Sequence, residues 1–228
     1  MRYGVAFLVF AVALTYAALR QGGWMLLLLW PAASFGLVAL GYAVLGPRVM
    51  GKDSLGDHCW WSRIVLLPFR LFTLGGWYFG RLLAGGPPHV EIAPGIWLGR
   101  RVRVDQLPSD TRLVIDLTSE FRATPGMRDG REYLCIPALD ARVPDEAACR
   151  AAIDRISTAA GGVYIHCAQG FGRSATVAAI LLIHRGDCRD VEEAERRLAT
   201  LRPGVRLNRR QREFVRRLTQ TRDDPTIH

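Results

Sequence analysis

The sequence predicts an α/β domain with a central, mostly parallel sheet flanked by helices, preceded by an N-terminal transmembrane helical hairpin. Two observations support this fold class. A long stretch near the N-terminus carries almost no charge. In the rest of the chain, short apolar runs typical of strands alternate with segments of helical pattern, which favours a layered α/β structure. At 228 residues, the chain is long enough for one α/β domain and a smaller module.

Two apolar segments begin the chain. Residues 3–19 are almost wholly apolar and lie between Arg2 and Arg20, and residues 22–46 carry no charge. Because a bilayer crossing needs roughly 20 apolar residues, the second segment qualifies and the first is borderline. The alternative for the first segment is a signal peptide with a basic start and a small-residue end. We predict a helical hairpin that turns at residues 20–23.

The charges that flank this hairpin predict its topology. Arg2 precedes it, and Arg48 and Lys52 follow it. Since short flanks rich in Arg and Lys stay in the cytoplasm, we expect an integral, multi-pass membrane protein whose α/β domain is cytoplasmic. The predicted divisions are two transmembrane helices (1–47), an interfacial amphipathic segment with a linker (48–88) and the α/β domain (89–228).

A third apolar region, residues 60–83, is interrupted by Arg63, Arg70 and Arg81 and is too charged for a confident span. Its tryptophans suit the headgroup zone of a bilayer. Pro68 predicts a break in the helix. We therefore expect two amphipathic helices that lie in the membrane interface. The alternative is a layer that packs on the α/β domain.

Charge and cysteine content narrow the possible partners. The formal net charge of +9 suits a chain that lies against an anionic membrane. Nucleic acid is not an expected partner, because no stripe of aromatic and basic residues is present. The five cysteines are scattered and lack the spacing of metal ligands, so neither a disulfide framework nor a metal site is expected.

The α/β domain shows three apolar runs that predict strands and four segments that predict helices. The predicted strands cover residues 113–117, 133–136 and 163–165. The predicted helices cover residues 145–160, 175–184, 191–201 and 208–218.

A loop between the last predicted strand and an apolar helix holds the most informative residues. Gly170 and Gly172 let the backbone curl tightly and approach a ligand closely. Backbone N–H groups at the start of the helix make an anion site, and the same field favours the thiolate form of Cys167. Arg173 offers a planar, two-pronged donor to phosphate oxygens. Ser174 can donate a hydrogen bond to the sulfur.

The pattern His166-Cys167-x-x-Gly170-x-x-Arg173-Ser174 resembles the signature loop of the cysteine-dependent protein tyrosine phosphatase superfamily, and its dual-specificity branch most closely. Residues 92–99 resemble the first strand of that branch, and residues 202–208 resemble its arginine–proline turn. The resemblance covers about residues 90–220. The alternative is a buried cysteine in an ordinary strand-to-helix turn.

The resemblance implies a role for each loop residue. Cys167 would be the nucleophile, with His166 and Ser174 supporting it and Arg173 holding the substrate. The implied phosphate-binding loop consists of Ala168, Gln169, Gly170, Phe171, Gly172 and Arg173. Gln169 stands where many members carry alanine, which leaves the substrate preference open.

Hydrolysis also needs an acid that protonates the leaving oxygen. Residues 136–140 resemble the movable loop that carries this acid in the family, so Asp140 is the predicted acid. Asp145 is the rival, but its place after Pro144 and before an alanine-rich run predicts a helix cap. No tryptophan precedes Asp140, which suggests a short flap and a shallow site.

The implied activity is that of a membrane-anchored phosphatase that hydrolyses phosphate monoesters through a phosphocysteine intermediate, with no cofactor and no metal. The expected substrates are phosphoproteins of the tyrosine or dual-specificity type. One alternative is a phosphatase acting on phospholipid headgroups, of the phosphatidylglycerophosphate or phosphoinositide type, for which membrane lipids would be partners. Two further alternatives are a phosphate-binding module without turnover and a rhodanese-like sulfurtransferase.

Two further segments of the α/β domain allow two interpretations each. Glu120, Phe121 and Arg122 follow a predicted strand and would either rim the site or form an ordinary exposed loop. The arginines of residues 206–217 would either meet lipid phosphates or an acidic partner, or form a solvated helix face.

Overall fold

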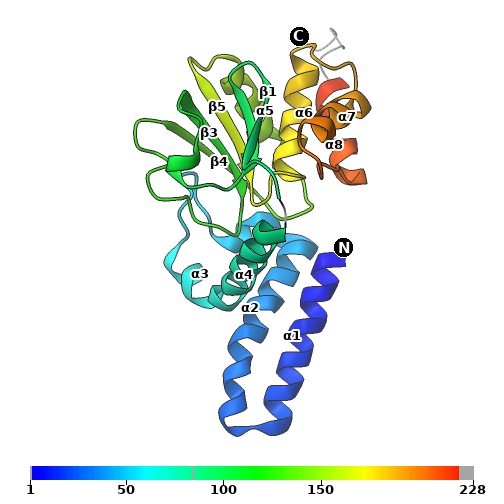
Figure 1. Cartoon of the computed structure of the whole chain (residues 1–228). Helices are drawn as coiled ribbons and strands as arrows, with labels where there is room; N and C mark the ends of the chain where they lie inside the picture. Colours follow the sequence, from blue (N-terminus) through cyan, green and yellow to red (C-terminus); the bar gives the residue numbers. More distant parts are fainter. Residues whose placement is uncertain (1, 84, 221–228) are drawn as a thin grey trace. The chain divides into compact units, whose positions relative to one another are not determined.

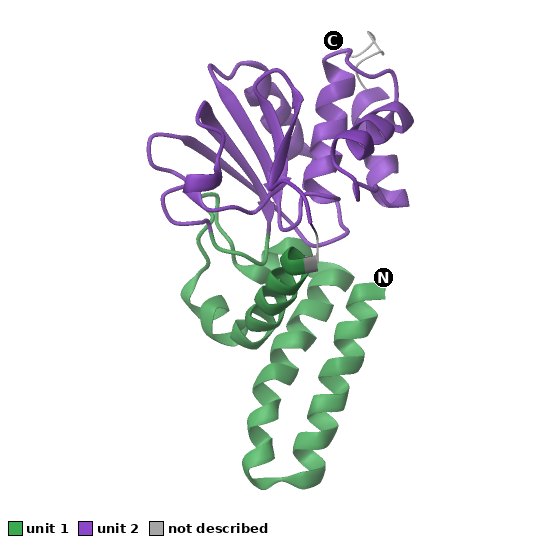
Figure 2. Ribbon diagram, in the orientation of Figure 1, with its two compact units in different colours: residues 1–84, 119–122 green, residues 85–118, 123–228 purple. Residues whose placement is uncertain are grey.

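The structure is a computed structural model that describes residues 2–83 and 85–220. The chain forms two compact units (Figure 2). Unit 1 comprises residues 1–84 and 119–122, and unit 2 comprises residues 85–118 and 123–228. The end of the predicted α/β domain, residues 221–228, lies outside the described residues.

Unit 1 begins with a helical hairpin (Figure 1). Helix α1 (Arg2–Gln21) is followed by the 3₁₀ segment η1 (Gly23–Leu28) and helix α2 (Leu29–Leu40). The run continues through the π turn η2 (Gly41–Leu45) and the 3₁₀ turn η3 (Gly46–Met50). Gly22 and Gly23 have φ angles of 63° and 55°, which glycine adopts without strain. The predicted turn between the two helices is confirmed.

The hairpin is packed through small and aromatic side chains. Ala11 and Ala18 of α1 are buried, and the Phe35 ring lies 4.8 Å from that of Phe10. The outer surfaces stay apolar, since Leu27 and Val44 are 76% and 77% exposed. Among the described residues, two helical runs, Arg2–Gln21 and Gly23–Met50, are long and apolar enough to cross a membrane.

Helices α3 (Trp60–Val65) and α4 (Leu67–Leu83) follow, and they are separated at Leu66. Pro68 is the second residue of α4, where its missing N–H costs nothing. The buried Phe69 packs edge-on against Phe35, with ring centroids 5.9 Å apart. The interruption therefore lies where Pro68 predicts it.

Residues 119–122 are built into unit 1. The Nε2–H of His58 donates a hydrogen bond to the Ser119 carbonyl oxygen at 3.0 Å. Arg122 forms an ion pair with Asp57, and the Phe121 ring lies 6.2 Å from that of Trp77. Phe121 is 7% exposed, so this segment is not an ordinary exposed loop.

Unit 2 holds a five-stranded sheet of order β1-β2-β5-β3-β4. Strand β1 pairs with β2 in an antiparallel manner, and all other pairs are parallel, which confirms the predicted fold class. The strands are β1 (His89–Ala93), β2 (Ile96–Arg100), β3 (Thr111–Thr118), β4 (Glu132–Ala138) and β5 (Gly162–Cys167).

One predicted strand was wrong. The run of residues 92–99 is not a single strand, because β1 and β2 form a hairpin in which Ala93 pairs with Ile96. Pro94 and Gly95 make the turn, and Gly95 has a φ angle of 71°. A proline followed by a glycine at positive φ suits a tight two-residue turn, and this turn divides the segment that resembles a single first strand.

The two faces of the sheet are covered differently. Helices α5 (Glu146–Ser157), α6 (Arg173–His184), α7 (Val191–Leu201) and α8 (Arg209–Gln220) share one core with Leu113 and Ile115 of β3, and Figure 1 shows α6, α7 and α8 together on one side of the sheet. Val114 points to the other face and packs with Val102, Met127 and Tyr164. This alternation follows from the two-residue period of a strand.

The first testable prediction concerns His58. Burial lowers its pKa to about 4, helped by Arg70, Lys52 and Arg63 and opposed by the bond to Ser119. The unfolded side chain binds a proton below its ordinary pKa of 6.5, so the stability from neutral His58 is fully present above pH 6.5. It is lost as the pH falls towards 4, and it amounts to at most about 3 kcal/mol.

We expect the thermal midpoint of the detergent-solubilised protein to fall between pH 7 and pH 5. The variant His58→Asn should show a smaller fall, because an amide has no charge to bury. An equal fall in the variant would contradict the assignment.

Candidate active site

The loop predicted to hold an anion joins β5 to α6. Cys167 is the last residue of β5, and Arg173 is the first residue of α6. The loop therefore lies at the carboxyl end of parallel strands, where open α/β sheets place their ligands. Gly170 has a φ angle of 79°, and a Cβ there would lie 2.6 Å from the Gly99 carbonyl group. Only glycine fits this close approach to β2.

The carbonyl groups of the loop are turned outward. The Arg101 N–H donates to Ala168 at 3.2 Å, the Arg206 N–H to Phe171 at 3.3 Å, and the Thr176 N–H to Gly172 at 2.8 Å. The side chain of Arg202 binds the carbonyl oxygens of Gln169 and Gly170. In a trans peptide, the N–H points opposite to the carbonyl oxygen of the same peptide group. The N–H groups that follow these carbonyls are therefore turned inward.

The sulfur of Cys167 lies on the inner side of this loop. The Gly170 N–H donates to Sγ at 3.2 Å, and the Ser174 hydroxyl donates to it at 3.3 Å. Sγ also faces the N-terminus of α6, whose dipole favours a negative charge. Cys167 is 3% exposed, so these donors act in a poorly hydrated place.

The Arg202 side chain contacts the outward-facing carbonyl groups of the loop. Its guanidinium donates to Gly170 at 3.1 Å, to Gln169 at 3.0 Å and to Pro87 at 3.0 Å. It also lies over the Phe171 ring at 4.9 Å. Burial lowers the pKa of Arg202. The guanidinium is buried among carbonyl oxygens, which satisfy its donors without cancelling its charge.

Arg173 is buried next to the loop, with 1% of its surface exposed. Its Nη1 donates to the carbonyl oxygens of Ala138 at 2.9 Å and Leu117 at 3.5 Å. These oxygens belong to the ends of β4 and β3. The Nε atom faces the Asp140 carboxylate at 3.5 Å. The predicted nucleophile, arginine and acid are thus brought to one place.

Asp140 follows β4 on a bent segment. Its side chain is 61% exposed, and the next residue, Ala141, has a φ angle of 56°. This conformation is unfavourable for a residue with a Cβ. The Asn208 side-chain amide donates to the Ala141 carbonyl oxygen at 2.9 Å, which helps to hold the turn. The rival Asp145 caps α5, since its side chain accepts from the Ala148 N–H at 3.0 Å.

His166 points away from the helical face of the sheet. It is 3% exposed. Its Nδ1 lies 3.5 Å from the Cys167 carbonyl oxygen, and its Nε2 lies 3.9 Å from a carboxylate oxygen of Asp116. His166 therefore lies behind Cys167, on the face of the sheet opposite to the helices.

Comparison with solved structures identifies the fold. PTPMT1, determined in complex with PI(5)P, is 22% identical with a TM-score of 0.53, covering 59% of this chain and 96% of that chain. Tk-PTP in its active form is 24% identical with a TM-score of 0.51, covering 60% and 99%. A human tyrosine phosphatase-like serine/threonine/tyrosine-interacting protein is 18% identical with a TM-score of 0.53, covering 60% and 99%.

The fold is that of the dual-specificity phosphatases. At these identities the likeness shows the fold alone. No protein-family model and no curated protein matches the sequence.

Gln211 is a residue of this phosphatase fold that the sequence did not single out. It is 2% exposed, and its Oε1 accepts from the Asn208 N–H at 3.0 Å. Its Nε2 lies beside Gly172, 3.3 Å from where a Cβ of that glycine would be. Within residues 2–83 and 85–220, Nε2 has no hydrogen-bond partner. It is a buried donor at the base of the loop.

The other cysteines differ from Cys167. All five are free, but burial raises the pKa of Cys149 to about 12 and also raises the pKa of Cys188. These two remain thiols at neutral pH. Cys59 and Cys135 are partly exposed.

The basic face of α8 is largely engaged in ion pairs within unit 2. Arg209 pairs with Glu213 at 2.7 Å on the same helix. Three further pairs connect α8 to other helices: Arg212–Glu195, Arg216–Glu192 and Arg217–Glu146. These contacts favour the interpretation of this segment as a structural, solvated face.

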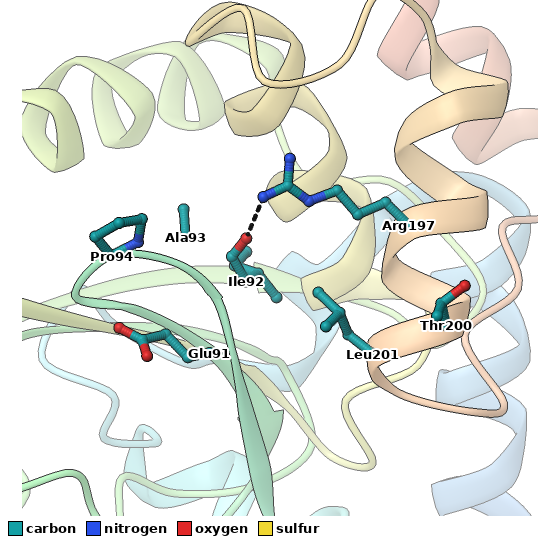
Figure 3. A pocket seen from close by; sticks show the side chains of 7 residues that line it. All are labelled: Glu91, Ile92, Ala93, Pro94, Arg197, Thr200 and Leu201. Atoms are coloured by element: carbon teal, nitrogen blue, oxygen red, sulfur yellow. Dashed lines mark hydrogen bonds between the residues drawn. The ribbon is translucent and has the colours of Figure 1, made fainter.

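A hollow of about 570 Å³ lies elsewhere in unit 2, between the β1–β2 hairpin and α7 (Figure 3). Arg197 donates to the Ile92 carbonyl oxygen at 3.0 Å and to the Asp187 carbonyl oxygen at 3.2 Å. Glu91 accepts from the Gly95 N–H at 2.8 Å. The charged groups at this hollow therefore hold the hairpin and α7 in place.

The second prediction tests the support of the loop. In Arg202→Ala, the carbonyl oxygens of Gln169 and Gly170 lose a buried donor, and each unpaired group costs about 1–3 kcal/mol. We expect the affinity for tungstate, a phosphate analogue, to fall about tenfold or more in isothermal titration. The exposed Arg210 provides the matched control, Arg210→Ala. Equal tungstate affinity in both variants would refute the role of Arg202.

Proposed function

We propose that the protein is a membrane-anchored phosphatase that hydrolyses phosphate monoesters through a phosphocysteine intermediate. The observation that carries this proposal is the orientation of the β5–α6 loop, whose carbonyl groups all turn away from the sulfur of Cys167. Inward N–H groups and the buried Arg173 make an electropositive cradle for the three peripheral oxygens of a phosphoryl group.

The first chemical step transfers the phosphoryl group to sulfur. The Cys167 thiolate attacks phosphorus, so an S–P bond forms while the bond from phosphorus to the leaving oxygen breaks. Asp140 gives its proton to that oxygen, which departs as an alcohol or phenol. Arg173 approaches the phosphoryl oxygens through the edge that carries Nε, since Nη1 is held by carbonyl groups.

The second step releases phosphate. Water attacks phosphorus, Asp140 takes a proton from that water, and the S–P bond breaks to return the Cys167 thiolate. The Ser174 hydroxyl, 3.3 Å from Sγ, stabilises the sulfur as it leaves. The buried Nε2 of Gln211 supplies a donor at the base of the loop, and we assign it to orienting the phosphoryl group or the attacking water.

We propose that unit 1 is the membrane anchor. Its two long apolar helical runs have the length and composition of membrane spans. Large side chains of α3 and α4 are also exposed, including Trp60 at 74% and Phe79 at 63%. Such residues suit the interface between headgroups and acyl chains.

The substrate class has two candidates. A phosphoprotein is the substrate that the sequence resemblance favours, with tyrosine or dual specificity. A phospholipid headgroup is the second candidate, because an anchored site would meet lipids continuously. The similar fold of PTPMT1, determined with PI(5)P, supports this second candidate.

The third prediction tests the chemistry. Cys167→Ser should abolish phosphate release, because an alcohol is a far weaker nucleophile than a thiolate, yet it should retain tungstate binding. Asp140→Asn should lower kcat by about 10²-fold or more on alkyl phosphates. It should lower kcat much less on aryl phosphates with good leaving groups. Phosphate release by Cys167→Ser at the wild-type rate would refute the proposed mechanism.

The fourth prediction separates the substrate classes. Full-length protein in mixed micelles would be given phosphotyrosine peptides, phosphatidylglycerophosphate and PI(5)P, with Cys167→Ser as the blank. We expect release of phosphate from at least one class. A higher kcat/KM on lipids would assign the enzyme to lipid metabolism, and a higher value on peptides would assign it to signalling. Tungstate binding without turnover on any substrate would leave only a phosphate-binding module.

A further inference from the structure

We infer that Asp116 is a positioning residue, whose buried carboxylate holds His166 as an imidazolium behind Cys167 and so favours the reactive thiolate. The inference rests on the proposed function for its effect on turnover, but the charge state of the pair is a property of the chain itself.

The fold places the two residues opposite each other. Asp116 on β3 and His166 on β5 are register partners in adjacent parallel strands. Both side chains lie on the face that is not covered by the four helices, where Val114 and Tyr164 also pack. The distance from His166 Nε2 to Asp116 Oδ1 is 3.9 Å. Asp116 is 1% exposed, so the pair is shielded from water and the charges interact strongly.

The surroundings of Asp116 favour its ionised form. The Thr118 N–H and hydroxyl both donate to Oδ1 at 2.7 Å. The Tyr133 hydroxyl donates to Oδ2 at 2.5 Å. Burial, together with the Asp116 carboxylate, raises the pKa of Tyr133 well above its ordinary value, so this hydroxyl keeps its proton. Three donors on one buried carboxyl group favour the carboxylate over the acid.

The surroundings of His166 favour two ring protons. Nδ1 faces the Cys167 carbonyl oxygen at 3.5 Å, and Nε2 faces the Asp116 carboxylate. Both of these oxygens accept hydrogen bonds and neither donates. An opposite charge near Nε2 favours the protonated, positively charged form of the ring. Its positive charge, attached to the residue before Cys167, stabilises a negative charge on the sulfur.

Other titratable or charged groups around this pair come from three strands. Tyr133 and Cys135 lie on β4, and Tyr164 and Cys167 lie on β5. Arg100 and Arg101, at the end of β2, add positive charge. These positive neighbours oppose a protonated His166, and the Asp116 carboxylate acts in the opposite direction.

The test compares Asp116→Asn with wild-type full-length protein in detergent. The pH dependence of Cys167 alkylation by iodoacetamide would be followed by mass spectrometry of its peptide. We expect alkylation of Cys167 at pH 6 to fall about tenfold in Asp116→Asn. Without the opposite charge of the carboxylate, the His166 ring should lose its second proton at a pH lower by about one unit or more. Cys167 then loses the neighbouring positive charge that favours its thiolate. The acid limb of kcat/KM should move to higher pH. Alkylation of the partly exposed Cys59 should not change.

Two further variants make the test specific. His166→Asn should reproduce the effect, and the double variant should add nothing to it. Tyr133→Phe, which removes a donor but leaves the Asp116 charge, should have a smaller effect. An unchanged alkylation profile in folded Asp116→Asn would overturn the inference, as would an effect of Tyr133→Phe equal to that of Asp116→Asn.

A measurement on the wild-type protein covers the case in which Asp116→Asn does not fold. The ¹⁵N spectrum of labelled histidine, assigned by His166→Asn, should show both ring nitrogens of His166 protonated at pH 7, and a neutral imidazole would overturn the inference. These measurements use no substrate. An enzyme without turnover would thus refute the proposed function and leave this inference standing.

Discussion

The β5–α6 loop imposes one demand on the rest of unit 2, because a peptide group that turns its N–H inward must turn its carbonyl outward. Outward carbonyls that are buried need donors, and an unpaired one costs about as much as a lost hydrogen bond. The donors come from the end of β2, from α6 and from the turn before α8, including Arg101, Arg202 and Arg206. The antiparallel hairpin, the buried helix and the arginine–proline turn are therefore parts of one support. A cradle made of backbone N–H groups is only as rigid as the partners of its carbonyl oxygens.

Two buried guanidinium groups lie against the loop, and backbone carbonyl oxygens accept hydrogen bonds from both. Burying a cation is costly unless its donors are satisfied. Arg202 donates to the carbonyl oxygens of Gln169, Gly170 and Pro87, and Arg173 donates to the carbonyl oxygen of Ala138. Carbonyl oxygens satisfy these donors as dipoles that carry no net charge. Arg173 also faces the exposed carboxylate of Asp140.

Local patterns in the sequence predicted the structural features that depend on residues close together along the chain. The turn at Gly22 and Gly23, the cap at Asp145 and the strand–loop–helix around Cys167 all follow from residues within a few positions of one another. The β1–β2 hairpin was missed because residues 92–99 were assigned as one strand by resemblance, without weighing the Pro94–Gly95 turn signal. Asp116, Gln211 and the donor role of Arg202 could not be found, since their partners lie far away in the sequence. Asp116 stands inside a run that indicates only a buried strand, and its partner His166 belongs to another strand. The one usable signal was that a carboxylate in a buried strand requires a partner.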